Sequence, residues 1–565
     1  MTSTSFPKPL IVQGDQTMLL EVDNPLFEEA RGEIGPFSEL EKSPEHIHTY
    51  KLTPLSLWNA ASAGWTPDQV LQSMERFSRY GIPESIVFNV KEVMSRFGVL
   101  KLYGTAEPDT LWLTTTHNRV YREIEAFKRL QKYLVPTLHE GEKGFTLNLM
   151  HRGTIKQELI HLGFPVQDMA PLKEGDPLDI PLAEALDDGT LLTIRDYQRE
   201  AVDSVLGNRG PGTGYGTVVL PCGSGKTVVG LALMNKLATH TLILTTNVAA
   251  VHQWREELLE KTGLTADQIG EYTGDTKNIR PVTIGTYQVL VWRKDKTSEY
   301  NHFKIFREHN WGLIIYDEVH LLPAPVFRVT AELQAVRRLG LTATLVREDG
   351  AEADVFSLVG PKKYDVPWKQ LEAKGWIAKA FCHEVRIDLP DDQKIPYAVA
   401  NMKDKFRIAS VNPLKELIVL QLIENHREDS ILVIGQYLEQ LDSIAKRLGA
   451  PIITGKTPNP QRELIYNDFR RGKIHVLVVS KVANFAINLP DASVAIQISG
   501  TFGSRQEEAQ RLGRILRPKE KNSYFYSVIS RFTNEEEYAV NRQKFLTEQG
   551  YKYTIDIYDP QEVAP

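Results

Sequence analysis

The spacing of hydrophobic residues along the chain changes near residue 180. Between residues 46 and 120 apolar residues recur every three or four positions, in stretches that begin at Thr or Pro and end at Gly. This spacing predicts a small, mainly helical domain. Residues 1–45 are rich in Pro, Gly and acidic side chains, so we expect a loosely structured segment. Residues 121–180 combine a charged helix, a hairpin-like stretch and a Pro- and Asp-rich linker, which predicts a small α+β domain.

From residue 181 short apolar runs alternate with helical stretches. The first series is GTVVLP, TLILTT, PVTIGTY, WGLIIYDE and RRLGLTAT, and the second is SILVIGQY, PIITG, KIHVLVVS, ASVAIQISG and SYFYSVIS. Strand–helix alternation predicts buried parallel sheets. The fold class is therefore α/β, with two parallel-sheet domains in tandem. We place them at residues 181–365 and 411–565, with a connector at 366–410.

Length and charge narrow the classes of protein that fit this pattern. The 565 residues provide for three or four domains at about 150 residues each. With 66 basic and 72 acidic residues the net charge is −6. This excludes a uniformly basic coat, so DNA or RNA must be held by local basic grooves. Two cysteines, Cys222 and Cys382, exclude a disulfide framework and suit a reducing, cytoplasmic compartment. No membrane association is expected, because the sequence has neither a signal peptide nor a long apolar run.

The strongest candidate for chemistry is PCGSGKT at residues 221–227, between a predicted strand and a predicted helix. Glycines let backbone amides converge on phosphates, and the helix N-terminus adds positive potential. Lys226 can contact the phosphates and the Thr227 hydroxyl can ligate Mg²⁺. Leu220 replaces the first Gly of the full pattern. The expected cofactors are ATP and Mg²⁺, and the predicted binding residues are Pro221, Cys222, Gly223, Ser224, Gly225, Lys226 and Thr227.

A second motif follows about 90 residues later, where the apolar run WGLIIY leads into Asp317, Glu318 and His320. Carboxyl ends of parallel strands are where ligands bind in open α/β sheets. We expect Asp317 to hold the metal and Glu318 to orient or deprotonate the attacking water. His320 is grouped with the nucleotide-binding residues.

A third motif, QRLGRILR at residues 510–517, lies in the second predicted sheet domain. Its arginines fall three residues apart and would line one face of a helix. A solvated basic face is the alternative to an arginine finger that reaches ATP held by the first domain. Such a finger would make hydrolysis depend on domain closure, as in a motor. The predicted catalytic residues are thus Lys226, Asp317, Glu318, Gln510, Arg514 and Arg517.

In this order the three motifs resemble those of superfamily-two helicases and translocases, and further residues resemble the XPB family of DNA repair helicases. Arg195 and Gln198 match the family's glutamine motif, in which the glutamine would read adenine. Thr342 and Thr344 match the motif that couples hydrolysis to movement. Directly afterwards comes an Arg-Glu-Asp element similar to the one particular to this family: Arg347, Glu348 and Asp349.

The resemblance covers most of residues 46–555, beginning with HIHTYKLTPLSLWNAASAG. It implies two RecA-like motor domains behind an XPB-type amino-terminal domain and, by position, a damage-recognition-like domain. Two features depart from the family. Ala483, Asn484 and Asn488 stand where relatives carry Gly-Asp and a later Asp. The short segment before residue 411 leaves room only for a reduced thumb.

A translocase must hold the nucleic-acid backbone without reading sequence. Residues at the ends of predicted strands could form such a track, although each taken singly also fits a capped loop. The residues expected to bind DNA or to couple hydrolysis to it are Thr246, Trp254, Thr286, Tyr287, Thr342, Thr344, Arg347, Glu348, Asp349, Lys456, Lys481 and Arg511.

The resemblance implies an ATP-dependent 3′–5′ DNA helicase or translocase that acts in DNA repair at single-strand/duplex junctions. One alternative is a double-stranded DNA translocase or remodeller that does not unwind. Another is an ATP-binding scaffold with weak motor activity. Candidate protein partners are a nuclease or a repair-complex protein, and the sequence makes no prediction of oligomeric state.

Overall fold

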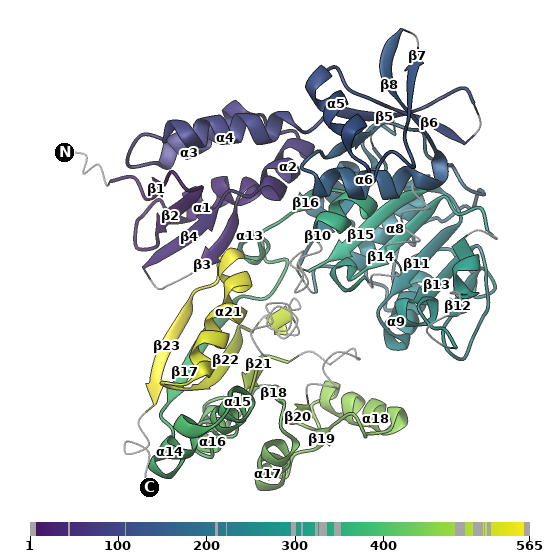
Figure 1. Ribbon diagram of the computed structural model, residues 1–565. Coiled ribbons are helices and arrows are strands. Elements are labelled where there is room, and N and C mark those ends of the chain that lie inside the picture. Colours follow the sequence, from purple (N-terminus) through teal and green to yellow (C-terminus); the bar gives the residue numbers. More distant parts are fainter. Residues whose placement is uncertain are drawn as a thin grey trace, which may run out of the picture. The chain divides into compact units, whose positions relative to one another are not determined.

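The computed structural model describes residues 7–42, 46–107, 109–139, 141–209, 213–221, 223–294, 301–306, 309–322, 326, 336–343, 352–480, 492–500, 512–513, 515–516 and 521–558. The chain divides into two compact units (Figure 1). The first comprises Met1–Leu220 and Gly225–Asp365, and the second Pro221–Ser224 and Val366–Pro565. No helix in the described part of the chain is long and apolar enough to cross a membrane.

The first unit begins with an antiparallel sheet in the order β1-β2-β4-β3. Its strands are β1 (Leu10–Val12), β2 (Thr17–Glu21), β3 (Glu39–Lys42) and β4 (Ile47–Lys51). The helices of this domain are α1 (Phe27–Ile34), η1 (Gly35–Phe37), α2 (Pro54–Ser62), α3 (Pro67–Phe77) and α4 (Glu84–Ser95). Leu10, Met18 and Leu20 lie in the core that the sheet shares with these helices.

The expectation of a loose segment at residues 1–45 is therefore wrong, and the domain is α+β rather than mainly helical. Strand β2 pairs with β4, for example through Leu20 and His48. The partner strand lies more than twenty residues further along the chain, so the local composition of residues 1–45 gives no sign of the pairing.

The second domain is a five-stranded sheet in the order β7-β8-β6-β5-β9, with its own hydrophobic core. Its strands are β5 (Leu100–Gly104), β6 (Thr110–Thr114), β7 (Val135–His139), β8 (Glu142–Asn148) and β9 (Val166–Asp168). The helices are α5 (Asn118–Ala126), η2 (Leu149–His151) and α6 (Arg152–His161). This domain includes β5 and β6, which the sequence pattern had assigned to the helical domain before it.

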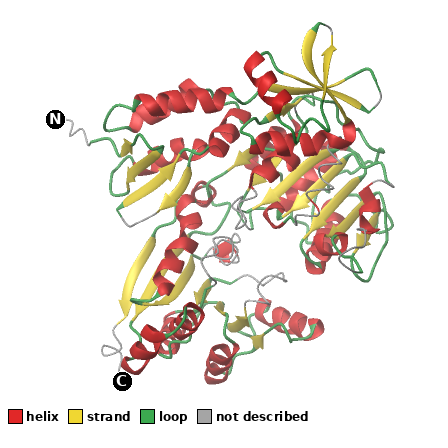
Figure 2. Cartoon of the chain, viewed as in Figure 1, coloured by secondary structure: helices red, strands yellow, loops and turns green. Residues whose placement is uncertain are grey.

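The third part of the first unit is a parallel sheet flanked by helices (Figure 2). It has seven strands, in the order β12-β13-β11-β14-β15-β10-β16. Its strands are β10 (Tyr215–Val219), β11 (Thr241–Thr245), β12 (Ile269–Tyr272), β13 (Val282–Thr286), β14 (Leu313–Asp317), β15 (Arg337–Thr342) and β16 (Lys362–Asp365). The helices are α7 (Asp196–Leu206), α8 (Lys226–Leu237), α9 (Val248–Lys261), α10 (Tyr287–Leu290), η3 (Asn301–Phe306), η4 (Val319–Leu321), α12 (Glu352–Asp354) and η5 (Val355–Val359).

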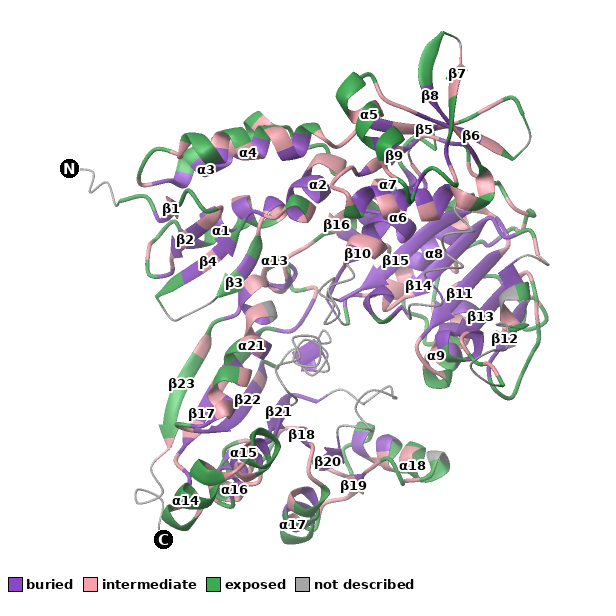
Figure 3. Cartoon of the chain, viewed as in Figure 1, coloured by how far each residue is buried: buried purple, intermediate pink, exposed green. Residues whose placement is uncertain are grey.

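The central strands of this sheet are buried along their length (Figure 3). That burial accounts for the continuous apolar runs in the sequence. Strands β14, β15 and β10 are neighbours. Their carboxyl ends therefore bring together the acidic motif, the start of the coupling motif and the phosphate loop.

The second unit contains another seven-stranded parallel sheet, in the order β19-β20-β18-β21-β22-β17-β23. Its strands are β17 (Ala380–Ile387), β18 (Ile431–Gly435), β19 (Ile452–Ile453), β20 (Val476–Ser480), β21 (Val494–Gln497), β22 (Ser523–Ser530) and β23 (Tyr553–Tyr558). The helices are α13 (Trp368–Ala373), α14 (Asp391–Val399), α15 (Met402–Ser410), α16 (Leu414–Asn425), α17 (Leu438–Leu448), α18 (Asn459–Arg470) and α21 (Asn534–Glu548).

Two parallel sheets in tandem confirm the predicted fold class. The expected connector at 366–410 needs correction, however. Strand β17 lies inside the second sheet, hydrogen-bonded to β22 on one side and to β23 on the other. The segment is therefore part of the second unit, because pairing with distant strands places it in that sheet.

Candidate active site

The phosphate loop joins the buried strand β10 to the first residue of α8, Lys226. Gly223 and Gly225 have φ angles of 79° and 80°, a left-handed conformation that glycine adopts without strain. The first turn of a helix has backbone N–H groups without intrahelical partners. The loop therefore leads into a helix N-terminus suited to anions.

Lys226 reaches from this loop to the acidic motif at the end of β14. Its Nζ donates a hydrogen bond to Glu318 Oε1 at 3.3 Å, and both side chains are largely buried. Two residues 92 positions apart, both predicted to be catalytic, are thus in direct contact. Thr227, the predicted metal-ligating hydroxyl, follows in the first turn of α8 and is partly exposed.

Asp317 is held by two aromatic side chains. Trp254 Nε1 donates to Asp317 Oδ2 at 2.9 Å, and the Tyr287 hydroxyl donates to the Asp317 backbone oxygen at 2.9 Å. Burial raises the pKa of Asp317 to about 6, and the negative charge of Glu318 adds to the rise, against the Trp254 hydrogen bond and Lys226. Negative charge is crowded at this point, so a cation would be favourable here.

Glu318 and His320 extend the site to the neighbouring strand. Glu318 adopts a left-handed conformation with φ 49°, which costs energy for a residue with a side chain and recurs at functional sites. His320 Nδ1 lies 3.5 Å from Glu318 Oε2. The same nitrogen shares a hydrogen bond with Thr342 Oγ1 at 2.7 Å. The buried His320 therefore links the acidic motif to the first residue of the coupling motif.

The predicted adenine-reading glutamine is buried and also contacts the phosphate loop. Gln198 Oε1 accepts from the Arg195 backbone N–H at 2.9 Å, and its Nε2 donates to the Gly225 carbonyl at 3.5 Å. Arg195 Nη1 donates to the Tyr197 hydroxyl at 3.2 Å. The glutamine motif is thus tied to the loop, and its contact with adenine stays a prediction.

Several residues expected to touch DNA have other roles. Trp254 and Tyr287 are 2% and 3% exposed, so their hydrogen bonds to Asp317 replace the predicted DNA contact. Thr286 is buried, and its hydroxyl accepts from the Val289 N–H at the start of α10. Thr246 is partly exposed and Lys456 is exposed, so both are accessible to a nucleic acid.

Other predicted site residues lie outside the described part of the chain. They are Cys222, Thr344, Arg347, Glu348, Asp349, Lys481, Gln510, Arg511, Arg514 and Arg517. The departures from the family pattern at Ala483, Asn484 and Asn488 lie outside it too. The roles of these residues stay predictions. Among their described neighbours, Leu512, Ile515 and Leu516 are buried.

Sequence reasoning missed the part that Trp254 plays beside the nucleotide site. One signal in the sequence pointed to it. Gly230 lies in the interior of a predicted helix, where alanine would make the helix more stable, so a glycine there suggests a close contact. A Cβ at Gly230 would lie 2.7 Å from Trp254 Cη2. The glycine therefore lets the indole approach α8, and α8 carries the phosphate loop.

The parallel sheet, the glycine loop and the Lys226–Glu318 pair define a motor domain of the helicase class. Sequence families agree with this assignment. “ERCC3/RAD25/XPB C-terminal helicase” matches residues 371–562, “Helicase conserved C-terminal domain” matches 10–139, and “Type III restriction enzyme, res subunit” matches 191–347.

Relatives of the chain identify the particular family. “DNA 3'-5' helicase XPB” of Kineococcus radiotolerans is 51% identical over 97% of this chain and 96% of its own length. The protein of the same name from Mycobacterium tuberculosis is 50% identical over 97% of both. A solved structure of S. cerevisiae Dbp5 bound to RNA and ADP BeF3 covers 65% of this chain and 90% of that one, with 15% identity and a TM-score of 0.46. The chain belongs to the XPB family of helicases.

Proposed function

We propose that this chain is an ATP-dependent 3′–5′ DNA helicase of the XPB type that acts in DNA repair. One observation carries the proposal: Lys226, the first residue of α8, contacts Glu318, which directly follows Asp317 at the end of β14. This contact is made in a chain 51% identical to a named 3′–5′ helicase. The names of these relatives support unwinding over a translocase that leaves the duplex closed, and over an ATP-binding scaffold.

ATP and Mg²⁺ fit the residues of the site. The first turn of α8 and Lys226 would bind the phosphates. Thr227 and Asp317 would hold Mg²⁺, which prefers hydroxyl and carboxylate oxygens. When bound, the ion neutralises charge on the phosphates. The raised pKa of Asp317 supports this role, because it reports a buried carboxylate crowded by Glu318.

Glu318 would act on the attacking water once Lys226 binds a phosphate instead of Glu318. Its Oε1 accepts from Lys226 Nζ in the present structure. A phosphate would compete for that nitrogen and leave the carboxylate available to orient water or to take its proton. The Lys226–Glu318 pair would thus keep the site inactive until nucleotide binds.

The second unit would complete the site with the arginine motif. Arg514 and Arg517 would stabilise charge in the transition state, and Gln510 would accompany them. The substrate would be DNA at junctions between single strand and duplex. A nuclease or a repair-complex protein is the proposed partner, because the sequence itself shows no nuclease carboxylate cluster.

The experiment that tests the proposal is the substitution Glu318→Gln. We expect the variant to bind ATP and to lose DNA-stimulated hydrolysis by about 10²–10⁴-fold, the range for loss of a general base. Glu256→Gln is the matched control, because Glu256 is exposed on α9, and it should hydrolyse ATP normally. Wild-type turnover by Glu318→Gln would contradict the proposal.

A further inference from the structure

The turn η5 (Val355–Val359) belongs to the cores of two domains at once. All five of its residues are buried. Phe356 lies in the hydrophobic core of the amino-terminal domain, whereas Val355, Leu358 and Val359 lie in a core of the motor domain. The backbone of η5 forms a π-helical turn, a rare conformation that occurs frequently at functional sites. This turn therefore joins the amino-terminal domain to the motor domain.

The side chain just before η5 brings the five-stranded domain into this contact. Gln157 Nε2 donates a hydrogen bond to Asp354 Oδ1 at 2.7 Å, and His161 Nε2 lies 3.2 Å from the same oxygen. Gln157 and His161 are about one turn apart on α6, so they lie on the same face of that helix. The Asp354 side chain is 17% exposed, and a largely buried carboxylate needs hydrogen-bond donors. Helix α6 supplies donors from a different domain.

The residue after η5 packs against the strand that leads into the phosphate loop. A Cβ added at Gly360 would lie 2.6 Å from the Cα of Gly216 in β10, so the two backbones approach closely. The Thr217 hydroxyl donates to the Gly360 carbonyl at 3.1 Å, and the Thr217 N–H donates to the Pro361 carbonyl at 2.8 Å. A shift of η5 would therefore also shift β10.

The same turn lies close to the acidic motif. A Cβ added at Gly340 in β15 would lie 3.1 Å from Val359 Cγ1 and 3.3 Å from Val319 Cγ1. Val319 directly follows Glu318 in the chain. Protein interiors are closely packed and transmit strain, so these neighbours would move when η5 moves. The turn is thus in a position to affect both the phosphate loop and Glu318.

We propose that Asp354 is a positioning residue through which the five-stranded domain controls ATP turnover. The hydrogen bond from Gln157 holds Asp354 and, with it, η5. In turn, η5 keeps β10 and Val319 in the positions that space the phosphate loop correctly from Glu318. A displacement of α6 would misplace Glu318 relative to a bound nucleotide and slow hydrolysis. This inference rests on the proposed function and adds to it a means of regulation.

The substitution Gln157→Glu tests this proposal, because it places a second carboxylate against Asp354 and like charges repel each other. We expect kcat for DNA-stimulated ATP hydrolysis to fall about tenfold, since a small misplacement of reacting groups is enough for such a loss. The dissociation constant for ATP should not change. Adding Asp354→Asn should restore kcat, because the new amide can donate to the new carboxylate. A merely structural contact would change the stability of the fold and leave kcat of the folded protein as in wild type.

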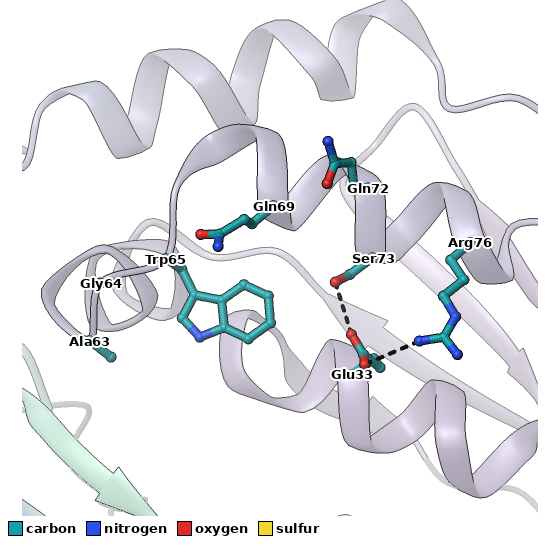
Figure 4. A pocket seen from close by; sticks show the side chains of 8 residues that line it. All are labelled: Glu33, Ala63, Gly64, Trp65, Gln69, Gln72, Ser73 and Arg76. Carbon is teal, nitrogen blue, oxygen red and sulfur yellow. Dashed lines mark hydrogen bonds and ion pairs between the residues drawn. The ribbon is translucent and has the colours of Figure 1, made fainter.

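The control makes the same change at a glutamine far from η5 in the contact network. Gln72 is exposed on α3, at an open hollow beside Trp65 whose lining residues include none from η5 (Figure 4). Gln72→Glu should hydrolyse ATP like wild type. Activity of wild type and of this control shows that the proposed function holds, so an equal kcat for Gln157→Glu would overturn this inference alone. Failure of Asp354→Asn to restore kcat would overturn it as well.

Amide hydrogen exchange of the wild-type chain gives a second test that needs no variant. A ligand that binds best to the correctly spaced site should in turn hold α6 in place, because coupling between two sites is reciprocal. ADP with aluminium fluoride mimics the phosphoryl group during transfer. It should slow exchange in α6 (Arg152–His161) and leave α5 (Asn118–Ala126) of the same domain unchanged. Slower exchange at the start of α8 without any change in α6 would contradict the inference.

Discussion

Asp317 depends on its neighbours to keep its carboxylate charged in a buried place. Burial and the charge of Glu318 raise its pKa, whereas the Trp254 hydrogen bond and Lys226 lower it. The indole N–H therefore favours the ionised form and also fixes the position of the carboxylate. Trp254 acts through Asp317, so it is a positioning residue.

The substitution Trp254→Phe tests this role at the scale of one hydrogen bond. Phenylalanine keeps an aromatic ring in the core and removes the N–H donor. Since a hydrogen bond to a charged group contributes about 1.5–3 kcal/mol, we expect kcat for DNA-stimulated ATP hydrolysis to fall about 10- to 100-fold. Steady-state kinetics should show this fall in kcat with little change in nucleotide binding. Trp292→Phe, at an exposed tryptophan, should hydrolyse ATP normally, and an unchanged kcat for Trp254→Phe would rule out the role.

Helix α8 begins at the phosphate loop and packs against Trp254 at Gly230. Gly230→Ala should stabilise an isolated helix by about 1 kcal/mol, but its Cβ would lie 2.7 Å from Trp254 Cη2. We therefore expect the indole to shift and kcat to fall. In a double-mutant cycle with Trp254→Phe the two losses should not add, because both act on the same contact. Strictly additive losses would show that the glycine acts elsewhere.

Helix α6 is fastened to β9 by the buried Asp168. Burial alone would raise the pKa of Asp168, but Lys156 and Arg152 outweigh it and hold that pKa well below its usual range. The resulting stability is fully present above the unfolded value of about 3.9 and is lost as the pH falls below it. Asp168→Asn should therefore cost about 3–5 kcal/mol at neutral pH, the usual cost of breaking a buried pair.

Urea unfolding in chloride buffers checks this prediction. The difference in the free energy of unfolding between wild type and Asp168→Asn should narrow as the pH falls below about 4. Asp203→Asn is the control, because Asp203 forms an exposed ion pair with Lys236, and it should cost under about 1 kcal/mol. A difference that stays constant down to about pH 3 would contradict the account of Asp168.

Elements with strong local patterns could be predicted from the sequence, and elements formed by distant pairing could not. Strands such as β10 and β14 are buried on both faces and read as apolar runs. Strand β2 precedes α1 in the sequence, and its partner β4 follows α1. The acidic residues and prolines of this stretch hide the residue pattern that would predict the two strands. Tyr287 directly follows β13 and Trp254 lies in α9, the helix after β11, but sequence position alone does not show that their side chains turn into the core.

At the scale of the whole molecule, strand order builds the site from separate motifs. The phosphate loop, the acidic motif and Thr342 come from β10, β14 and β15, which are neighbours in one sheet. The order of motifs along the chain predicted this convergence, because carboxyl ends of parallel strands share an edge. The net charge of −6 does not conflict with a DNA motor, because phosphate contacts need only a local track such as one including Lys456.

Strand displacement on tailed duplexes tests the central claim most directly. Wild type and Glu318→Gln would be assayed on DNA with a 3′ or a 5′ single-stranded tail, with and without ATP. The helicase account predicts ATP-dependent displacement by wild type of the duplex with the 3′ tail, and no displacement by Glu318→Gln. ATP hydrolysis without displacement by wild type, or displacement that survives Glu318→Gln, would contradict it.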